Sequence, residues 1–522
     1  MKTYNFNKIH IVLASFLLLI FSCSNEIDNV VNSNNPDRNQ VLATGSDLIG
    51  VTSGGFVTWW QANGRDLYPP LAVAGDIATC SWGNFGMRVL SSEPRNPIIN
   101  ASSWADISVL EQPWQGNYGA ISSANDVLGA INNNGVTWIA AGVDNTPMVS
   151  AASYLLRGLS YGYLGLLFEK GFEVDENTDL TQELEFVSYQ QLITMALSDL
   201  DSAIALANSN TFEIPNTVIN GVTISDAKLI RLCNSFKARF IVQSARNMTE
   251  TNAIDWSLVK MLTENGITED FGPIGDNGIS WWNNSNVLMD SPNGFGPFGA
   301  RLDMRLVKLL DPSQPEFFPG SAGSVLDNPE MTSADARVGD GRDFEFRPSI
   351  LFRSDRGRFH FSHYFHTRFL NDPTFSDGAD AKQIKTFTFE DNRLLLAEAK
   401  ARMNDAGAIT DINAGSRVTR GNLAPLTGAE TQEEILNAIF YERYIELFNT
   451  AVGSGYFDRR RTNDLQVGTF RHLPVPSSEL EVLSQALYTL GGTNADPTGV
   501  VPHYDLTSVP ERMDDSFIPT FN

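Results

Sequence analysis

The chain has 522 residues, of which 42% are hydrophobic and 19% are charged. This length and composition allow a large buried core and exclude a disordered or low-complexity chain. Its formal charge is -24, from 37 Lys plus Arg against 61 Asp plus Glu, and no basic stripe offsets it. The charge therefore argues against a nucleic-acid partner.

Residues 1–22 have the pattern of a signal peptide, in which Lys2 and Lys8 precede an apolar run from Ile11 to Phe21. This run is shorter than the ~20 residues that a membrane-spanning helix needs. The run ends in Ile-Phe-Ser-Cys23, which resembles a bacterial lipobox. We therefore expect cleavage before Cys23 and acylation of this cysteine, with an ordinary secretory signal as the alternative. A flexible tether is expected to extend from Cys23 to residue 46.

Apolar residues at spacings of three and four predict helices in two parts of the chain, 115–264 and 389–486. Thr431 and Glu434 have the spacing of a capping box at one helix start. About four helix pairs are predicted: 150–170 with 188–208, 226–247 with 256–264, 389–404 with 409–423, and 431–450 with 478–485. The predicted fold is mainly α, a tetratricopeptide-like helical superhelix, although no clean 34-residue repeat is present.

Two other stretches, 50–114 and 265–388, are rich in Gly, Pro, Asn and aromatic residues. Alternating side chains in Arg358–Phe365 predict short strands there. We expect these stretches to form an irregular, loop-rich insertion face on the helical scaffold, within one domain spanning 47–522. Because loops carry most binding sites, a ligand is expected on this face.

Four sequence segments resemble the SusD/RagB family of Bacteroidetes nutrient-binding outer-membrane lipoproteins. They are Trp114-Gln-Gly-Asn-Tyr118 with Ala124-Asn125; Leu156-Arg157-Gly158 with Tyr161-Gly-Tyr163-Leu164; Leu394-Leu-Leu-Ala-Glu-Ala399 with Ile412-Asn413 and Arg417; and Glu442-Arg443-Tyr-Ile-Glu446-Leu447, Tyr456-Phe-Asp-Arg-Arg460 and Leu473-Pro-Val-Pro-Ser-Ser-Glu479. The likeness covers nearly all of the chain after Cys23. The family's Glu-Gly-x-Arg element is replaced here by Asn449–Gly455.

The resemblance implies a SusD-like fold and a non-enzymatic protein that captures glycans for a SusC-like TonB-dependent transporter. It also implies a lipid anchor in the outer membrane, and Glu26 and Asp28 resemble the signal that exports such lipoproteins to the cell surface. No cofactor is expected. The alternatives are a peptide-binding, RagB-like member of the same uptake system and a structural scaffold of the transporter that binds no ligand.

Five charged residues in the last matching segment are expected to form a buried ion-pair network with a structural role: Glu442, Arg443, Glu446, Asp458 and Arg460.

Sugar rings bind well to exposed aromatic faces flanked by directional hydrogen-bonding groups. Two loop clusters fit this description, and we expect them to form the ligand site together: Trp82, Asn84, Phe85 and Arg88 in the first, and Trp281, Trp282 and Asn283 in the second. The alternative for each tryptophan is that it pins its loop to the core, since tryptophan is largely buried on average.

Motifs that suggest an enzyme are weak. Gly158–Gly162 matches the nucleophile elbow but lies in a helical stripe, and Gly294–Gly299 matches a dinucleotide-binding loop without a preceding strand. His360, His363 and His366 are spaced by three, which on a strand puts His363 on the opposite face from the other two. We therefore expect no catalytic residues and no metal site, although a glycosidase carboxylate pair stays open. Cys80 and Cys233 receive no chemical role.

Overall fold

Helices dominate the computed structural model, which describes residues 42, 44–276, 278–282, 300–319, 329–348, 356–368 and 383–492. The predicted signal peptide and Cys23 lie outside the described residues. Within the described part of the chain, no helix is both long enough and apolar enough to cross a bilayer. The structure agrees with the predicted fold class, a mainly α scaffold with a few short strands.

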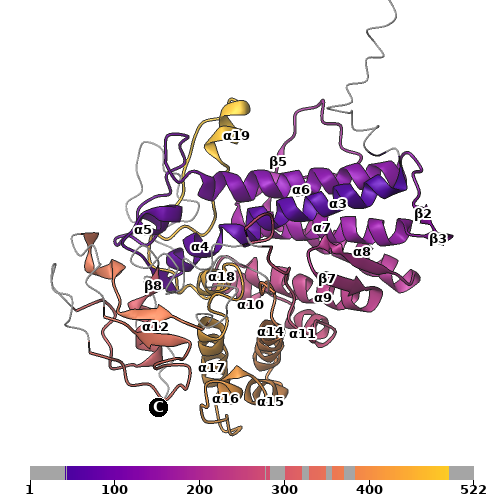
Figure 1. Ribbon diagram of the computed structural model, residues 1–522. Helices are drawn as coiled ribbons and strands as arrows, with labels where there is room; N and C mark the ends of the chain where they lie inside the picture. The colour runs from indigo at the N-terminus through magenta and orange to yellow at the C-terminus, as the bar shows by residue number, and fades with distance from the viewer. Residues whose placement is uncertain are drawn as a thin grey trace, which may run out of the picture.

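Four long helices run side by side in the N-terminal half (Figure 1): α3 (Gly45–Trp60), α6 (Ser108–Asn132), α7 (Thr146–Leu167) and α8 (Tyr189–Ser209). Helix α7 contacts the other three and also α9 (Asp226–Gln243), so almost all of its residues are buried. Ser188 caps α8 by accepting from Gln191 N, and Ser225 caps α9 by accepting from Lys228 N.

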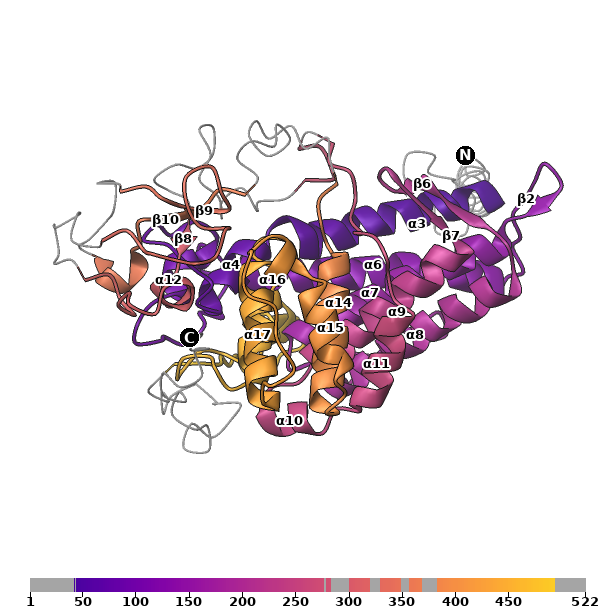
Figure 2. The same cartoon turned by 90° about the horizontal axis from the view of Figure 1, so that it is seen from below.

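The remaining helices of the scaffold include a second group, in which α10 (Met248–Asn252) and α11 (Trp256–Glu264) are magenta in Figure 2 and the later helices are orange to yellow: α14 (Phe389–Arg402), α15 (Gly407–Asn413), α16 (Ser416–Thr419), α17 (Gln432–Ile445) and α18 (Ser454–Arg461). The last helix, α19 (Ser477–Val482), lies apart from this group in Figure 1. Three predicted pairs are present, because α7 packs against α8, α9 against α11, and α14 against α15. The predicted capping box of α17 is also present.

The fourth predicted pair is wrong. Helix α17 packs against α14, α15 and α18, whereas α19 lies at the opposite end of the molecule in Figure 1. The reason is a polar clamp from the N-terminal half. The Asn100 amide donates to Val475 O at 2.9 Å and its oxygen accepts from Ser477 N at 2.8 Å, which holds the start of α19 there.

The strands are short and, among the described residues, lie in two-stranded antiparallel sheets: β1 (Ala78–Thr79) with β8 (Arg301–Leu302), β2 (Ile139–Ala140) with β3 (Val143–Asp144), β4 (Lys170–Phe172) with β5 (Phe186–Ser188), β6 (Glu213–Ile219) with β7 (Val222–Ser225), and β9 (Phe344–Phe346) with β10 (Tyr364–His366). The β1–β8 register, Ala78 opposite Leu302, joins the two predicted loop regions. The alternating segment predicted as strand is strand only in β10, since Arg358–His360 forms a 3-10 turn, η7.

Helix α3 occupies the end of the predicted tether and the start of a predicted loop region. It begins at Gly45, and Gly55 lies where it crosses two other helices. A Cβ at Gly55 would lie 2.5 Å from Leu156 of α7 and 2.9 Å from Ser123 of α6. The glycine is therefore needed for close helix packing, although in the sequence it resembles a loop residue. Short helical segments follow α3: η2 (Gln61–Arg65), α4 (Tyr68–Ala74), η3 (Asn84–Gly86), α5 (Met87–Leu90) and, in the middle region, α12 (Met304–Leu310).

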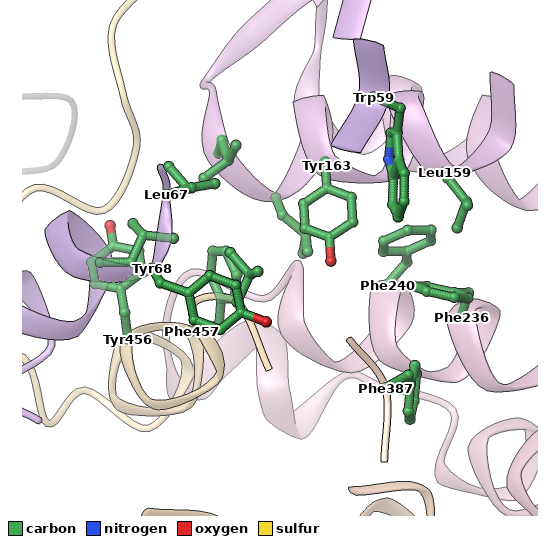
Figure 3. Packing of buried hydrophobic residues seen from close by; sticks show 14 of the residues in the cluster. Trp59, Leu67, Tyr68, Leu159, Tyr163, Phe236, Phe240, Phe387, Tyr456 and Phe457 are labelled. Carbon is green, nitrogen blue, oxygen red and sulfur yellow. The ribbon is translucent and has the colours of Figure 1, made fainter. Parts of the chain in front are cut away.

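One aromatic core joins the two helix groups (Figure 3). The Tyr163 ring of α7 meets Trp59 of α3 and Phe240 of α9 edge-on, each at 6.0 Å between centroids. Phe236 extends the cluster to Phe387, at 5.3 Å, just before α14. Edge-to-face contacts of this kind add about 0.5–1.5 kcal/mol each beyond area burial. The core thus fixes the end of α3 relative to both groups.

A buried ion-pair network lies between α14, α17 and α18. Arg443 contacts Asp391 at 2.9 Å and Asp458 at 2.7 Å, and Arg461 contacts Asp458 at 2.9 Å and Glu398 at 2.6 Å. All five side chains are 0% exposed. Burial raises the pKa of Glu398, but Arg461 and Arg402 hold it at about 2. Each buried charge is therefore balanced by a partner on another helix.

The other predicted network residues fall in two places. Arg337 contacts Glu442 at 2.8 Å and Glu446 at 3.1 Å, so these two carboxylates form a second cluster that reaches into the middle region. Arg460 was expected in the network, but it donates to the backbone carbonyls of Leu166 at 2.8 Å and Gln243 at 2.6 Å. Arg460 therefore ties α18 to α7 and α9, and Arg461 takes the ion-pair position.

Asp303, the N-cap of α12, should make stability depend on pH. Burial, together with the neighbouring carboxylates Asp76 and Glu93, raises the pKa of this carboxyl to about 7 despite the nearby Arg305. The pKa of Asp303 is about 4 in the unfolded state and about 7 in the folded state, so between these pH values the folded state binds more protons. The protonated carboxyl therefore favours folding at low pH, and this stabilisation is lost as the pH rises from about 4 to 7. Asp303→Asn keeps the cap, and we expect it to raise Tm more at pH 8.5 than at pH 5.

Asp311, at the other end of α12, is the matched control for this measurement. Burial opposes its ionisation, but hydrogen bonds from Ser313 and Thr332 hold its pKa below the ordinary value. Its contribution is therefore present above the unfolded pKa, and Asp311→Asn should lower Tm at pH 8.5. Equal Tm changes for Asp303→Asn at the two pH values would contradict the assignment.

Candidate functional site

The two tryptophans of the second loop cluster have different surroundings. Trp281 is 6% exposed and its ring lies 6.2 Å from the ring of Trp60, at the end of α3. Trp60 Nε1 donates to the carbonyl of Trp282 at 2.9 Å, and the Asp276 carboxylate accepts from Trp281 N at 2.9 Å. Trp281 thus pins its loop to the core. Trp282 is only partly buried, and Asn283 lies outside the described residues.

A short π-helix, η2, continues α3 directly beneath Trp282. The guanidinium of Arg65, its last residue, lies 5.4 Å from the centroid of the Trp282 ring. Arg65 also pairs with Asp66 at 2.9 Å, and both side chains keep about a fifth of their surface exposed, at 23% and 19%. A π-turn inside a helix is often found at functional sites. Here it places an aromatic ring, a cation and a carboxylate next to one another.

The first loop cluster follows β1 and contains strained backbone. Phe85 has φ of 55°, in the left-handed region that an aromatic residue rarely adopts. Gly86 follows with φ of 68°, and a Cβ there would lie 3.4 Å from the ring of Trp104. Strain of this kind persists where the surroundings enforce it, often at binding sites. Phe85 lines a cavity together with residues of η2 and α6.

A small cavity of about 70 Å³ lies where these elements meet. Phe85 lines it together with Asp66 of the segment after η2 and Gln112 of α6. Phe85 and Asp66 line the same cavity, Asp66 pairs with Arg65, and Arg65 lies by the Trp282 ring, so residues of both predicted clusters gather around one helix end. We call Trp282, Arg65, Asp66 and Phe85 the platform.

Trp82, another predicted residue of the first cluster, contacts the middle region. The guanidinium of Arg356 lies 5.2 Å from the Trp82 ring centroid and donates to Ser81 O at 2.6 Å. Burial, together with the positive charges of Arg88, Arg95 and Arg356, lowers the pKa of His360 to about 4, so this imidazole is neutral at pH 7. Trp82 is therefore held by the middle region, Arg88 lies near enough to His360 to affect its charge, and Asn84 is partly buried.

Sequence reasoning missed Arg65, Asp66 and Gln112. The only signal for the first two was a charged pair soon after Trp59-Trp60. Gln112 carries no signal, because a polar residue on an amphipathic helix is the usual solvent-facing residue.

A larger cavity, of about 600 Å³, lies between β7, α9 and residues 267–274. Lys228 and Glu269 form an exposed ion pair there at 2.7 Å. Phe271 is the aromatic residue of its lining and is 6% exposed. This cavity therefore offers no exposed ring for stacking, and the platform fits a sugar better.

No family model and no curated protein matches the chain. Solved structures do match it. A SusD superfamily protein from Parabacteroides distasonis aligns with a TM-score of 0.60 and 13% identity over 84% of this chain and 97% of that one. A SusD superfamily protein from Bacteroides vulgatus gives 0.53 and 14%, covering 84% and 97%. The surface glycan-binding protein A of Bacteroides thetaiotaomicron gives 0.53 and 13%, covering 86% and 99%.

The chain has the SusD-like fold. The resemblance seen in the four sequence segments is thereby confirmed at the level of the fold. Two of these segments lie in the core of this fold, since Tyr161 and Tyr163 of α7 and Glu398 of α14 are at most 1% exposed. They are therefore parts of the scaffold.

Two of the enzyme-like motifs have structural roles, and the third, Gly294–Gly299, lies outside the described residues. Ser160, at the centre of the elbow-like motif, is 0% exposed and donates to Leu156 O inside α7. His363 and His366 are buried among aromatic rings, including Phe346 and Phe448. Across the described ranges, no three His, Cys, Asp or Glu side chains are grouped so as to hold a metal ion. Cys80 and Cys233 are buried free thiols.

Proposed function

We propose that this protein is a cell-surface glycan-binding protein that captures an oligosaccharide and delivers it to a SusC-like TonB-dependent transporter in the outer membrane. The observation that carries the proposal is the platform at the end of α3, in a fold shared with a surface glycan-binding protein. Since 13% identity shows only the fold, the ligand class is argued from the platform's chemistry.

The platform matches the two kinds of surface that a sugar offers. The C–H faces of a pyranose stack on aromatic rings, and Trp282 and Phe85 supply such rings. The hydroxyls need directional partners, which Arg65 supplies as a donor and Asp66 as an acceptor. The Arg65–Asp66 pair holds both groups in place before a ligand arrives, which reduces the entropy that binding costs.

The proposed anchor is consistent with a site at the outer membrane. Acylation of Cys23 would hold the chain at the outer membrane, since several acyl chains give stable attachment where one gives marginal binding. Residues up to about 44 then connect the anchor to the start of α3 at Gly45. Delivery to a transporter in the outer membrane requires that the ligand is captured close to that membrane.

Calorimetry with a panel of plant, host and microbial glycans tests the proposed function. The mature chain, residues 23–522, should bind at least one oligosaccharide with an affinity that is nearly the same at 50 mM and 500 mM NaCl, because neutral sugars carry no charge to screen. Basic peptides bound by the acidic chain would instead show strong salt dependence. Binding of peptides alone, or of no ligand, would overturn the proposal in favour of the peptide-binding or scaffold alternative.

A further inference from the structure

The cavity beside Phe85 is too small for a sugar ring. Its volume is about 70 Å³, whereas complete ligand pockets measure roughly 300–1,000 Å³. A single water needs about 10–15 Å³ of such space, so the cavity has room for a group of a few heavy atoms. It is therefore the size of a substituent of a larger ligand that lies on the platform.

The lining combines an apolar slot with hydrogen-bonding groups. Its apolar residues are Ala62, Leu67, Pro70, Phe85, Val109 and Pro113, and its polar residues are Asp66, Ser108 and Gln112. Ser108 and Gln112 lie on the first turns of α6, and Asp66 is held by Arg65 at 2.9 Å. A group that matches this lining has a small apolar end and a carbonyl oxygen that accepts from Ser108 or Gln112. It fits best if it also has an N–H that donates to the Asp66 carboxylate.

We propose that this cavity binds the acetyl substituent of a glycan, an inference that rests on the proposed glycan-binding function. The methyl group fits between Phe85 and Val109, the carbonyl accepts from Gln112 or Ser108, and the N–H of an acetamido group donates to Asp66. The sugar ring then lies outside the cavity, on the side of Trp282.

Other small substituents fit less well. A carboxylate, as in a uronic acid, would be repelled by Asp66. The methyl group of a 6-deoxy sugar would fill the slot but leave the polar lining without partners, which costs affinity. An O-acetyl ester shares the methyl and the carbonyl with an acetamido group and lacks only the N–H. The cavity therefore selects acetyl groups, with N-acetyl sugars preferred.

Pairs of glycans in which one member carries an acetyl-bearing substituent and the other a hydroxyl test the inference by calorimetry. Chitohexaose and cellohexaose share one β-1,4-linked backbone, and acetylated xylan is compared with the same xylan after alkaline deacetylation. Further pairs from the glycan panel differ by one acetamido group. We expect the acetylated member of a bound pair to bind about tenfold more tightly, the equivalent of about one hydrogen bond. The xylan pair separates O-acetyl from N-acetyl recognition.

Two variants test whether the preference for acetylated glycans arises in the cavity. Gln112→Leu keeps the volume but removes the amide, and Ser108→Phe covers the cavity mouth from an exposed position. Both should reduce the preference to less than about threefold, while binding of the non-acetylated member stays within about twofold of the parent. Gln115→Leu, an exposed glutamine three residues further along α6 and outside the cavity lining, is the matched control and should keep the preference.

The outcomes separate this inference from the proposed function. Glycan binding with no acetyl preference, or a preference that survives both variants, overturns the inference and leaves the proposed function standing. Absence of binding to every glycan overturns both. Loss of the preference in the Gln115→Leu control also overturns the inference, because the effect would then not depend on the cavity lining.

Discussion

Arg461→Met should destabilise the protein by about 3–5 kcal/mol, because it leaves two carboxylates buried without this partner. Glu398 and Asp458 are 0% exposed and contact Arg461 at 2.6 Å and 2.9 Å. Methionine retains much of the side-chain volume, so the change tests the charge more than the packing. The free energy of unfolding, measured by urea denaturation at pH 7, gives the result.

An exposed ion pair provides the control. Lys228 and Glu269 lie 2.7 Å apart, but their side chains are 56% and 66% exposed. Lys228→Met should change stability by less than about 1 kcal/mol, since surface pairs contribute little. Equal losses for Arg461→Met and Lys228→Met would show that burial does not set the strength of the network.

Replacing the two platform rings should have the largest effect on binding. Trp282→Ala and Phe85→Ala each remove one stacking surface, worth about 0.5–1.5 kcal/mol beyond area burial, so each should weaken glycan binding by up to about tenfold. The double variant should approach a 100-fold loss if the two rings act independently. Calorimetry with the best glycan of the panel measures the loss, and the Tm of each variant checks its fold.

Ile279→Ala is the control in the same loop as Trp282. Ile279 is 78% exposed and is not part of the platform, so its replacement should leave affinity unchanged. Trp82→Ala separates the two sides of the first cluster, because Trp82 faces Arg356. A loss confined to Trp82→Ala would place the glycan on that side and contradict the platform.

Sequence periodicity predicted the long helices because their apolar stripes are regular, as in α7 and α8. It did not predict α3, in which Gly50, Gly54 and Gly55 interrupt the stripe. Glycine in a sequence suggests a loop, whereas Gly55 permits close packing with Leu156 and Ser123. A loop glycine and a glycine at a helix crossing differ only in which residues pack against them, and the sequence does not contain this information.

The sequence could not show which of two adjacent, identical residues points to the core and which to the site. Trp281 and Trp282 are adjacent and alike, yet one ring enters the core and the other lies over Arg65. Arg460 and Arg461 are likewise adjacent, and the turn of about 100° between consecutive helical residues sends them to different partners. The residue types were predictable, but the direction of each side chain depends on the packing of its element.

The continuity of α3 with η2 has a mechanical consequence. The 16 residues of α3 span about 24 Å of helix at 1.5 Å per residue, and Phe56 and Trp59 fix its rotation in the core. Helix α3 therefore holds the platform at a fixed distance and orientation from Gly45. As a result, the platform cannot turn independently of the helices that pack around α3.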